Sequence, residues 1–543
     1  MVKTGCQGQR GSTNGQESLD LGGSNLRWYS HNMAASTYQP VLGRTGLANP
    51  NFASNFDSSL SASPLTNMAY HLTLIFIVLL IGRVPEITTL FIGSSFYQIL
   101  ILNVVLMAFL VITGTLVRVG ATGGGTLVIA FHLWILFTLP FSGYRRGSLD
   151  AFINLLPLIP SFLFIAGFLS RNADTLRKGL FAMACAGAVG VGYLHKVGAQ
   201  MEEDRYSAGQ GTFGNSNLVA IYLLMLTPIW ALVAANSKYK WIVRLIFLGL
   251  IADGFSIVLQ TGSRSGFMTM GLMLVLLFVG ESMANKAKIL VVTVLGVFLA
   301  LGAMTDNLKS RIGTIFNSEA KDETSAEAME SSSARMALLM ESIDVTMRHP
   351  LVGAGFGVYS ETSAAERQKK GLRGLWQVTH NLYTQVSSEV GFPGFFIYIS
   401  GVIWCLRTIF RVKGAALKSP DLAPLYPMAR ALGFCWVVFL FNGVFTSMAV
   451  DFFYYVLTGY TIALSLVFQN MRRQQSQNAM FGNTVAAPRS SRFFPAPAAA
   501  ALPAPAMVPV GIGSGDQAPL KTDDAPWRRN PRKHPPGPGA PSR

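Results

Sequence analysis

Long apolar blocks separated by short polar turns run along most of this chain. The blocks are roughly 16 to 24 residues long, which is enough, at about 1.5 Å per residue, to cross a hydrocarbon core near 30 Å thick. Apolar and polar side chains do not alternate within the blocks with a period of two, so the pattern does not favour a membrane β-barrel. The pattern predicts an all-α polytopic membrane protein with about twelve transmembrane helices.

The twelve expected spans have approximate cores at residues 70–92, 95–117, 126–142, 148–170, 179–195, 217–236, 241–260, 265–280, 287–304, 391–410, 428–447 and 451–468. The first span is the least regular of them, because Arg83, Pro85 and Glu86 interrupt its apolar run.

One long polar stretch interrupts the pattern between spans nine and ten, from Thr305 to Glu389. Loops longer than about 15 residues are uncommon in compact proteins unless they have a function. An amphipathic helix is expected within the stretch, from about Ser332 to Met347, and glycine-rich turns follow it. We therefore expect residues 305–390 to form a large loop that carries the chemistry.

The two ends of the chain differ in composition from the apolar middle. Residues 1–66 are rich in Gly, Ser, Asn and Gln, and residues 471–543 are rich in Pro, Ala and Arg. Such segments lack the apolar residues that form a core, so both are expected to be disordered. No cleavable signal peptide is recognised at the start. The expected organisation places spans one to nine at 67–304 and spans ten to twelve at 391–470.

Only 13% of the residues are charged, and the formal net charge is +16. The Lys and Arg residues gather in the short loops after spans four, six, eight and ten and after the last span. Basic short loops are typical of the cytoplasmic side. Both termini are therefore expected in the cytoplasm and the long loop in the periplasm. Basic residues do not alternate with aromatic ones as in nucleic-acid sites, so the expected partner is the lipid bilayer and not nucleic acid.

One pair of cations disagrees with this topology, because Arg145 and Arg146 fall on the outer face. Either a span is miscounted or the pair binds an anionic group such as a lipid head group.

Several kinds of site are not indicated. The four cysteines are scattered, without the paired spacing of a zinc site or a disulfide framework. The sequence has no Gly-Lys-Ser/Thr phosphate loop and no Asp-x-Asp pair on the outer face. We expect no metal and no other cofactor.

Four polar features fall on the same expected face as the long loop. They are the segment Gly211–Asn217, the turn Gln260–Gly266, Arg335 in the expected amphipathic helix, and Asp451 between spans eleven and twelve. Their coincidence on one side predicts a single active surface.

Arg264 is the most informative single residue. It lies in a very short turn between two apolar spans, at a depth where an ionisable residue is costly and by default a functional candidate. A guanidinium binds phosphate oxygens bidentately, and Gly262 and Gly266 allow a phosphate to approach closely. The alternative is an arginine whose charge merely extends to the membrane surface. The sequence of the turn alone does not distinguish a phosphate-binding arginine from one that merely extends to the membrane surface.

His380 is the candidate general base, because an imidazole accepts a proton near neutral pH. Asn381 and Tyr383 follow it and could orient a substrate or the imidazole. A loop histidine bonded to its own backbone is the more common case, and this ordinary role is assigned to four others, His71, His132, His195 and His349. Glu389 is expected to cap the N-terminus of span ten.

Three motifs together resemble the O-antigen ligase and polymerase superfamily of bacterial inner membranes. Residues 211–217, Gly-Thr-Phe-Gly-Asn-Ser-Asn, resemble the family's Gly-x-Phe-x-Asn-x-Asn segment, and residues 261–266, Thr-Gly-Ser-Arg-Ser-Gly, resemble its Thr-x-Ser-Arg-Gly/Ser turn. The stretch from Ser333 through His380 to Gly394 resembles its periplasmic loop. The resemblance covers roughly residues 70–470.

The resemblance implies a membrane glycosyltransferase of the GT-C type. Such an enzyme moves a glycan from undecaprenyl pyrophosphate to an acceptor hydroxyl at the periplasmic face, without metal. Arg264 and Arg335 would hold the pyrophosphate, and His380 would deprotonate or orient the acceptor hydroxyl. Asn215, Asn217 and Asp451 would support them.

The acceptor distinguishes the branches of the family. A ligase of lipopolysaccharide biosynthesis uses lipid A core, and an O-antigen or exopolysaccharide polymerase uses a second lipid-linked glycan. A protein O-oligosaccharyltransferase uses a protein. Outside the family, the alternatives are a transporter or flippase of polysaccharide precursors and a non-enzymatic assembly protein. Arg264 would lie at the bilayer midplane in a transporter and at the outer rim in the enzyme.

Overall fold

The computed structural model describes residues 63–84, 96–200, 205–209, 211–279, 323–371, 373–374 and 376–484, with six positions between 283 and 298. Contacts divide the chain into two units, Met1–Ala479 and Met480–Arg543, and the fold described below lies in the first except for the last five residues of α19. The expectations for residues 1–62, for span nine and for residues 485–543 lie outside the described residues.

The helices in chain order are α2 (Pro64–Ile81), α4 (Phe96–Ile112), α5 (Thr115–Gly120), α6 (Gly123–Thr138), η1 (Leu139–Phe141), α7 (Arg145–Leu155), α8 (Ser161–Leu169), α9 (Ala173–Val197), η3 (Gly211–Gly214), α10 (Ser216–Ala235), α11 (Trp241–Gln260), α12 (Arg264–Phe278), α15 (Glu323–Arg348), α16 (Tyr359–Lys369), α17 (Leu382–Ala416), η4 (Pro420–Leu425), α18 (Tyr426–Asn442) and α19 (Phe452–Thr484). The strands β1 (Ala199–Gln200) and β2 (Tyr206–Ser207) form an antiparallel pair between α9 and η3.

The expected all-α polytopic membrane fold is confirmed. Eight described helices are long and apolar enough to cross a membrane: α2, α6, α9, α10, α11, α17, α18 and α19, with α6 and α18 extended by η1 and η4. Residues Ile101–Ile112 of α4 and all of α12 are apolar but shorter. Helix α19 is almost wholly surrounded by protein, whereas only 22% of α11 is buried, so α19 lies in the core and α11 at the edge.

The prediction of span four as one continuous helix is wrong. The segment forms two short helices, α7 and α8, separated by residues 156–160. Pro157 and Pro160 stand in this gap, and proline lacks the N–H that a continuous helix requires. The segment still connects opposite ends of the bundle. Gly143 before α7 donates to the carbonyl of Ala354 in the polar loop, and Arg171 after α8 is hydrogen-bonded to Asn67 near the start of α2.

Other expected boundaries also shift. Helix α2 ends at Ile81, before Arg83, which has a φ of +53°. Span two ends at Ile112, and Gly114 with a φ of +64° separates it from α5. Helix α19 continues to Thr484, so the segment expected to be disordered from residue 471 begins as a helix.

Helix α17 contains the break that attaches the polar loop to the bundle. It begins at Leu382, inside the expected loop, and its backbone leaves the helical conformation at Gly391 (φ 73°, ψ 177°). Span ten was expected to begin at this glycine. A break frees backbone groups that would otherwise pair within the helix, and buried backbone groups need partners.

The loop supplies most of these partners. The N–H groups of Ala354 and Gly355 donate to the carbonyls of Ser388 and Glu389 (2.7 and 3.2 Å), and Phe392 N–H donates to the carbonyl of Pro350 (2.8 Å). The indole of Trp134 in α6 donates to the carbonyl of Val390 (2.8 Å).

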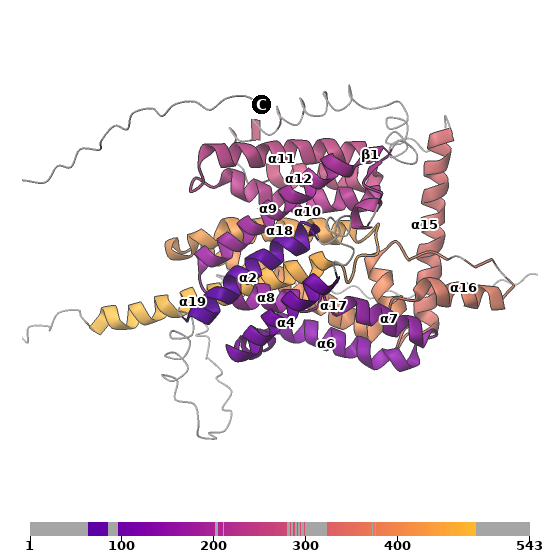
Figure 1. Cartoon of the computed structure of the whole chain (residues 1–543), viewed down its shortest axis with the longest axis horizontal. Helices are drawn as coiled ribbons and strands as arrows, with labels where there is room; N and C mark the ends of the chain where they lie inside the picture. Colours follow the sequence, from indigo (N-terminus) through magenta and orange to yellow (C-terminus); the bar gives the residue numbers. More distant parts are fainter. Residues whose placement is uncertain are drawn as a thin grey trace, which may run out of the picture. The chain divides into compact units, whose positions relative to one another are not determined.

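The expected amphipathic helix in the loop is confirmed and is longer than predicted, since α15 spans Glu323–Arg348. It runs across the ends of the bundle helices rather than along them (Figure 1). Leu338, Ser342 and Val345 are buried on one face. On the same face Thr346 is hydrogen-bonded to Ser387 of α17 (3.0 Å).

Ion pairs fix α16 against α15. Glu341 contacts Arg348 (3.1 Å) and Arg367 (2.9 Å), and Glu366 contacts Arg348 and His349. Glu341 and Glu366 are only 12% and 20% exposed, so these pairs are screened less than ordinary surface pairs.

Replacing Gly391 by Ala should destabilise the protein by about 1–3 kcal/mol or more, because alanine is strained at a φ of 73° and its Cβ would lie 2.4 Å from the carbonyl oxygen of Leu351. Thermal unfolding in detergent, followed by size-exclusion chromatography, measures the effect. Gly249→Ala in α11 is the matched control, since nothing lies within 4 Å of its new Cβ. Equal unfolding temperatures for the two variants would contradict this account of the break.

Candidate functional site

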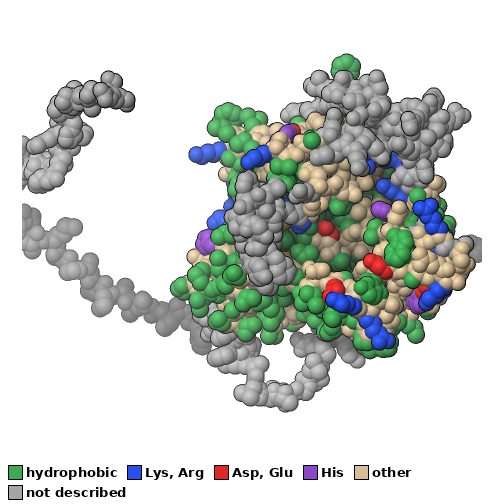
Figure 2. All heavy atoms as spheres, turned by 45° about the vertical axis from the view of Figure 1, so that its right-hand side comes forward, with side chains coloured by type: hydrophobic (Ala, Val, Ile, Leu, Met, Phe, Trp, Pro, Cys, Tyr) green, Lys and Arg blue, Asp and Glu red, His purple; other side chains and the backbone are tan. Residues whose placement is uncertain are grey.

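The predicted polar features gather at one end of the bundle, which we call the loop end because residues 350–357 cover it. Helices α10 and α12 begin there, α18 ends there, and α17 and α19 begin there. Figure 2 brings this side forward and shows acidic, basic and histidine side chains around a hollow, with hydrophobic side chains on the flank. The prediction of a common end for these features agrees with the fold.

Arg205 joins the first two motifs. Asn215 caps α10 by accepting from the N–H of Asn217 (2.8 Å). The side-chain oxygen of Asn217 accepts from Arg205 (3.0 Å), and the same guanidinium donates to the carbonyl of Thr261 (3.0 Å). The segment 211–217 and the turn 260–266 are therefore held side by side by one cation.

Arg264 is the first residue of α12, directly after the turn between α11 and α12, and is half-buried. Ser263 caps the helix by accepting from the N–H of Gly266 (3.1 Å). Gly266 packs so closely on α10 that a Cβ there would lie 2.8 Å from that of Ala220. The missing side chain at Gly266 lets the N-terminus of α12 lie against α10, so the helix start that carries Arg264 lies near the start of α10.

Arg83 joins the 211–217 segment to Asp451. Its guanidinium donates to the hydroxyl of Thr212 and lies over the ring of Phe452, 5.0 Å from the centroid. Asp451 caps α19 by accepting from the N–H of Phe453 (3.0 Å). Burial raises the pKa of Asp451, while the Phe453 N–H and the charge of Arg83 oppose this rise.

A cavity of about 280 Å³ lies between these groups. Its lining residues are Arg83, Leu158, Gln385, Ser447, Met448, Val450, Asp451 and Phe452. Polar groups from α17, from the loop before α19 and from the end of α2 therefore face one space.

His380 lies at the start of α17 and is held in an uncommon conformation, with a φ of +51°. Three hydrogen bonds attach its neighbours to the segment between α18 and α19, and a fourth is local. Thr379 contacts the hydroxyl of Ser447 (2.8 Å) and the carbonyl of Asn381 (3.0 Å). Asn381 donates to the carbonyl of Val444 (3.0 Å), and Leu382 N–H donates to that of Gly443 (2.6 Å). Backbone held this way outside the usual regions points to a functional position.

Arg335 approaches His380 from α15. Burial and, secondarily, the positive charge of Arg335 lower the pKa of His380 from its ordinary value of 6.5. Both effects disfavour the imidazolium, so the ring is neutral at pH 7 and able to accept a proton. The structure thus brings together two of the three predicted catalytic residues.

Other predicted substrate-binding residues have structural partners. Asn381 caps α17 by accepting from the N–H groups of Tyr383 and Thr384 (2.9 and 3.0 Å), and the Tyr383 hydroxyl donates to the carbonyl of Leu440 (3.0 Å). These residues position the start of α17.

Arg145 and Arg146 begin α7 at the loop end and are exposed, beside the glycine turns of residues 353–357.

The expectation that Glu389 caps span ten is wrong. Helix α17 begins seven residues earlier, at Leu382, and Asn381 caps it. Glu389 is buried, and its carboxylate instead accepts from the N–H of Gly357 (3.0 Å). It therefore holds the glycine turns of the loop against α17.

The backbone hydrogen bond expected for four histidines is confirmed for two of them and wrong for the other two. His71 and His132 contact backbone carbonyls four residues earlier, of Asn67 (2.8 Å) and Val128 (2.7 Å). His195 contacts Asp253 and His349 contacts Glu366, both at 2.8 Å. Within the part of the chain that the structure describes, no three His, Cys, Asp or Glu side chains are grouped so as to hold a metal ion.

Sequence reasoning missed Arg83, Arg205 and Gln385 as members of the site. Arg83 carried a usable signal, since a cation inside an apolar block is by default a functional candidate. The sequence gives no such indication for Arg205 and Gln385, because polar residues outside the motifs are common and their roles depend on distant partners.

One protein-family model matches part of the chain. Residues 246–399 match the family model described as O-antigen ligase. The matched segment includes the Arg264 turn, Arg335 and His380. No curated protein matches the chain.

The contact between Thr379 and Ser447 predicts a disulfide in the double variant Thr379→Cys/Ser447→Cys. The two side-chain oxygens are 2.8 Å apart, so sulfur atoms in their places can approach bonding distance after a small shift. Mild oxidation followed by peptide mass spectrometry should find the two peptides joined. Thr379→Cys/Ser476→Cys is the control, since Ser476 lies far along α19 from Asp451. Failure of the first pair to cross-link would contradict the placement of His380.

Proposed function

Because residues 246–399 match the family model described as O-antigen ligase, we propose that this protein is a membrane glycosyltransferase acting on a polyprenyl-pyrophosphate-linked glycan at the periplasmic face. The family match supports glycosyl transfer of the ligase or polymerase type. One observation carries the proposal further. Arg205 and Arg83 connect the 211–217 segment with the 260–266 turn and with the start of α19, at the end of the bundle where a neutral histidine lies in a strained conformation.

The arginines act on the donor in this proposal. Arg264 at the start of α12 and Arg335 on α15 bind the pyrophosphate of undecaprenyl pyrophosphate. As the bond between the anomeric carbon and the phosphate oxygen breaks, that oxygen keeps the electron pair and gains negative charge. Guanidinium groups already in place stabilise this charge without reorganisation, which is the role a metal ion has in other transferases.

His380 acts on the acceptor. Its neutral ring takes the proton of the acceptor hydroxyl as the oxygen attacks the anomeric carbon from the side opposite the leaving phosphate, which inverts that centre. The hydrogen bonds around Thr379 and Asn381 hold the ring in position. The cavity lined by Arg83, Gln385 and Asp451 lies next to this histidine and is large enough for part of a sugar ring.

The position of Arg264 favours an enzyme over a transporter. It begins α12 immediately after the turn from α11, at the end of both helices. A transporter of the kind considered above keeps its charged groups near the bilayer midplane.

A transfer assay tests the proposal. Purified protein, undecaprenyl-pyrophosphate-linked glycan and three acceptors (lipid A core, a second lipid-linked glycan and a protein) should give product with one acceptor, also in the presence of EDTA. His380→Ala and Arg264→Ala should each lower the rate by about 10²–10⁴-fold, as for other bases and charge-stabilising donors.

His71→Ala and Arg411→Ala are matched controls, because both residues are exposed and lie outside the loop end. They should retain the wild-type rate. The proposal would be overturned if folded wild-type protein bound the donor but transferred its glycan to none of the acceptors, and the His380 and Arg264 variants did the same. Transport or assembly would then be the better explanation.

The pH dependence of kcat/KM provides a second test. Because the pKa of His380 is lowered, the base is neutral at pH 7, and the rate should fall only as the pH drops below about 6.5. Arg335→Gln removes the neighbouring charge, so the pKa should rise and the acid limb should move to higher pH. Arg335→Lys keeps the charge and should leave the limb in place. The same limb in both variants would show that Arg335 does not tune His380.

A further inference from the structure

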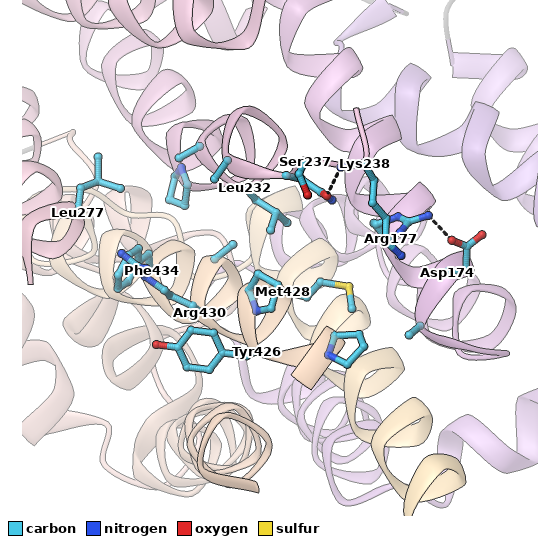
Figure 3. A pocket seen from close by; sticks show the side chains of 18 residues that line it. Asp174, Arg177, Leu232, Ser237, Lys238, Leu277, Tyr426, Met428, Arg430 and Phe434 are labelled. Carbon is cyan, nitrogen blue, oxygen red and sulfur yellow. Dashed lines mark hydrogen bonds and ion pairs between the residues drawn. The ribbon is translucent and has the colours of Figure 1, made fainter. Parts of the chain in front are cut away.

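A second cavity lies far from the proposed active site. It has a volume of about 590 Å³ and lies among α9, α10, α12, η4 and α18 (Figure 3). Its lining residues are Ala173, Asp174, Arg177, Pro228, Ala231, Leu232, Ala235, Asn236, Ser237, Lys238, Leu277, Pro424, Tyr426, Pro427, Met428, Arg430, Ala431 and Phe434. Nothing in the glycosyl-transfer proposal uses it.

The cavity is at the end of the bundle opposite the loop end. It is lined by the start of α9, the end of α10, the end of α12 and the start of α18. Helix α10 has 20 residues, so its two ends are about 30 Å apart. The cavity and the site therefore face opposite sides of the membrane.

Aromatic residues place the cavity at the level of the membrane–water interface. Trp241 begins α11 three residues after Lys238 and is 68% exposed, and Tyr426 begins α18 in the cavity wall. Trp and Tyr concentrate at the interface of a bilayer, where one part of the ring is apolar and the other meets water.

The wall of the cavity combines an apolar surface with cations. Pro228, Leu232, Met428 and Ala431 supply part of the apolar surface. Three cations line it, Arg177, Lys238 and Arg430, against the single acid Asp174, which leaves an excess of two positive charges, 3 − 1. Figure 3 shows Arg177 and Lys238 on one side of the space and Arg430 with Phe434 on the other.

Asp174 does not cancel this charge. It pairs with Arg177 and also with Lys178 (3.1 Å), a further cation just outside the lining. The Arg430 guanidinium lies 5.3 Å from the ring centroid of Phe434, which holds the cation at the edge of the apolar surface. A ligand that suits the cavity carries negative charge at one end and hydrocarbon at the other.

We infer that this cavity is a binding site for an anionic phospholipid of the surrounding leaflet. The head group lies across the opening between Arg177 and Lys238 on one side and Arg430 on the other, and an acyl chain follows the apolar wall between α10 and α18. Basic pockets between transmembrane helices bind such head groups elsewhere. Free phosphate would satisfy the cations but leave the apolar wall uncovered, which favours the lipid.

Native mass spectrometry of the full chain in detergent, titrated with phosphatidylglycerol or phosphatidylcholine, tests the inference. Phosphatidylglycerol should bind at least about tenfold more tightly than phosphatidylcholine. The double variant Lys238→Gln/Arg430→Gln should lose about tenfold or more of that affinity, since each cation near a head group contributes on the order of 1 kcal/mol. Lys418→Gln, a cation at the same end but outside the cavity, should change it less than about twofold.

A second pair of variants separates the cavity from surface charge. Ala235→Trp fills the cavity without changing charge and should abolish the preference for phosphatidylglycerol. Leu417→Trp is its control, because Leu417 is 67% exposed at the same end and does not line the cavity. Bound phosphatidylglycerol should also raise the unfolding temperature of the wild type but not of Ala235→Trp.

Three outcomes would overturn the inference. They are equal binding of the two lipids, unchanged binding in both cavity variants, and complete displacement of the lipid by millimolar inorganic phosphate, which would identify a simple anion site. Each is independent of transfer activity.

Discussion

The exchange of backbone hydrogen bonds at Gly391 is the constraint on which the loop end depends. A membrane helix normally satisfies every backbone group within itself, and a break at the membrane interface leaves several without partners. Here residues 350–355 provide them, through the carbonyl of Pro350 and the N–H groups of Ala354 and Gly355. The loop thus supplies hydrogen-bond partners that the broken helix α17 needs, and it is not a separate cap over the bundle.

This attachment determines where the chemical groups can be. The loop carries α15, and α15 carries Arg335, so Arg335 comes near His380 because the loop is fixed to the N-terminal part of α17. Glu389 strengthens the attachment from within α17 by accepting from Gly357. A buried carboxylate is costly unless it is hydrogen-bonded, and this one has a backbone partner at 3.0 Å.

The two ends of the bundle use cations in different ways. At the loop end, Arg83 and Arg205 are held by protein oxygens, those of Thr212, Asn217 and Thr261, so their positions are preorganised. At the other end, the cavity places Lys238 and Arg430 beside apolar surface at interface level. Fixed cations suit a framework that holds the proposed pyrophosphate-binding residues in place, and cations next to hydrocarbon suit a phospholipid. The proposed roles of the two ends follow from this contrast.

The sequence by itself determined the class of fold and the residues worth testing. Blocks of apolar residues predict membrane helices because the length of a block must match the bilayer, and the motifs around Arg264 and His380 lie in the segment that matches the O-antigen ligase family. The break in span four was also available from Pro157 and Pro160, although the apolar pattern hid it.

Only the tertiary structure decided which of these residues meet. Arg83 contacts Thr212, 129 positions away, and Thr379 contacts Ser447, 68 positions away. Glu389 proved to hold a turn of the loop instead of capping a helix. Helices that are apolar on every side carry no pattern that marks their neighbours. Their order around α19, and therefore the meeting of distant polar side chains, depends on close packing between surfaces that look alike in the sequence.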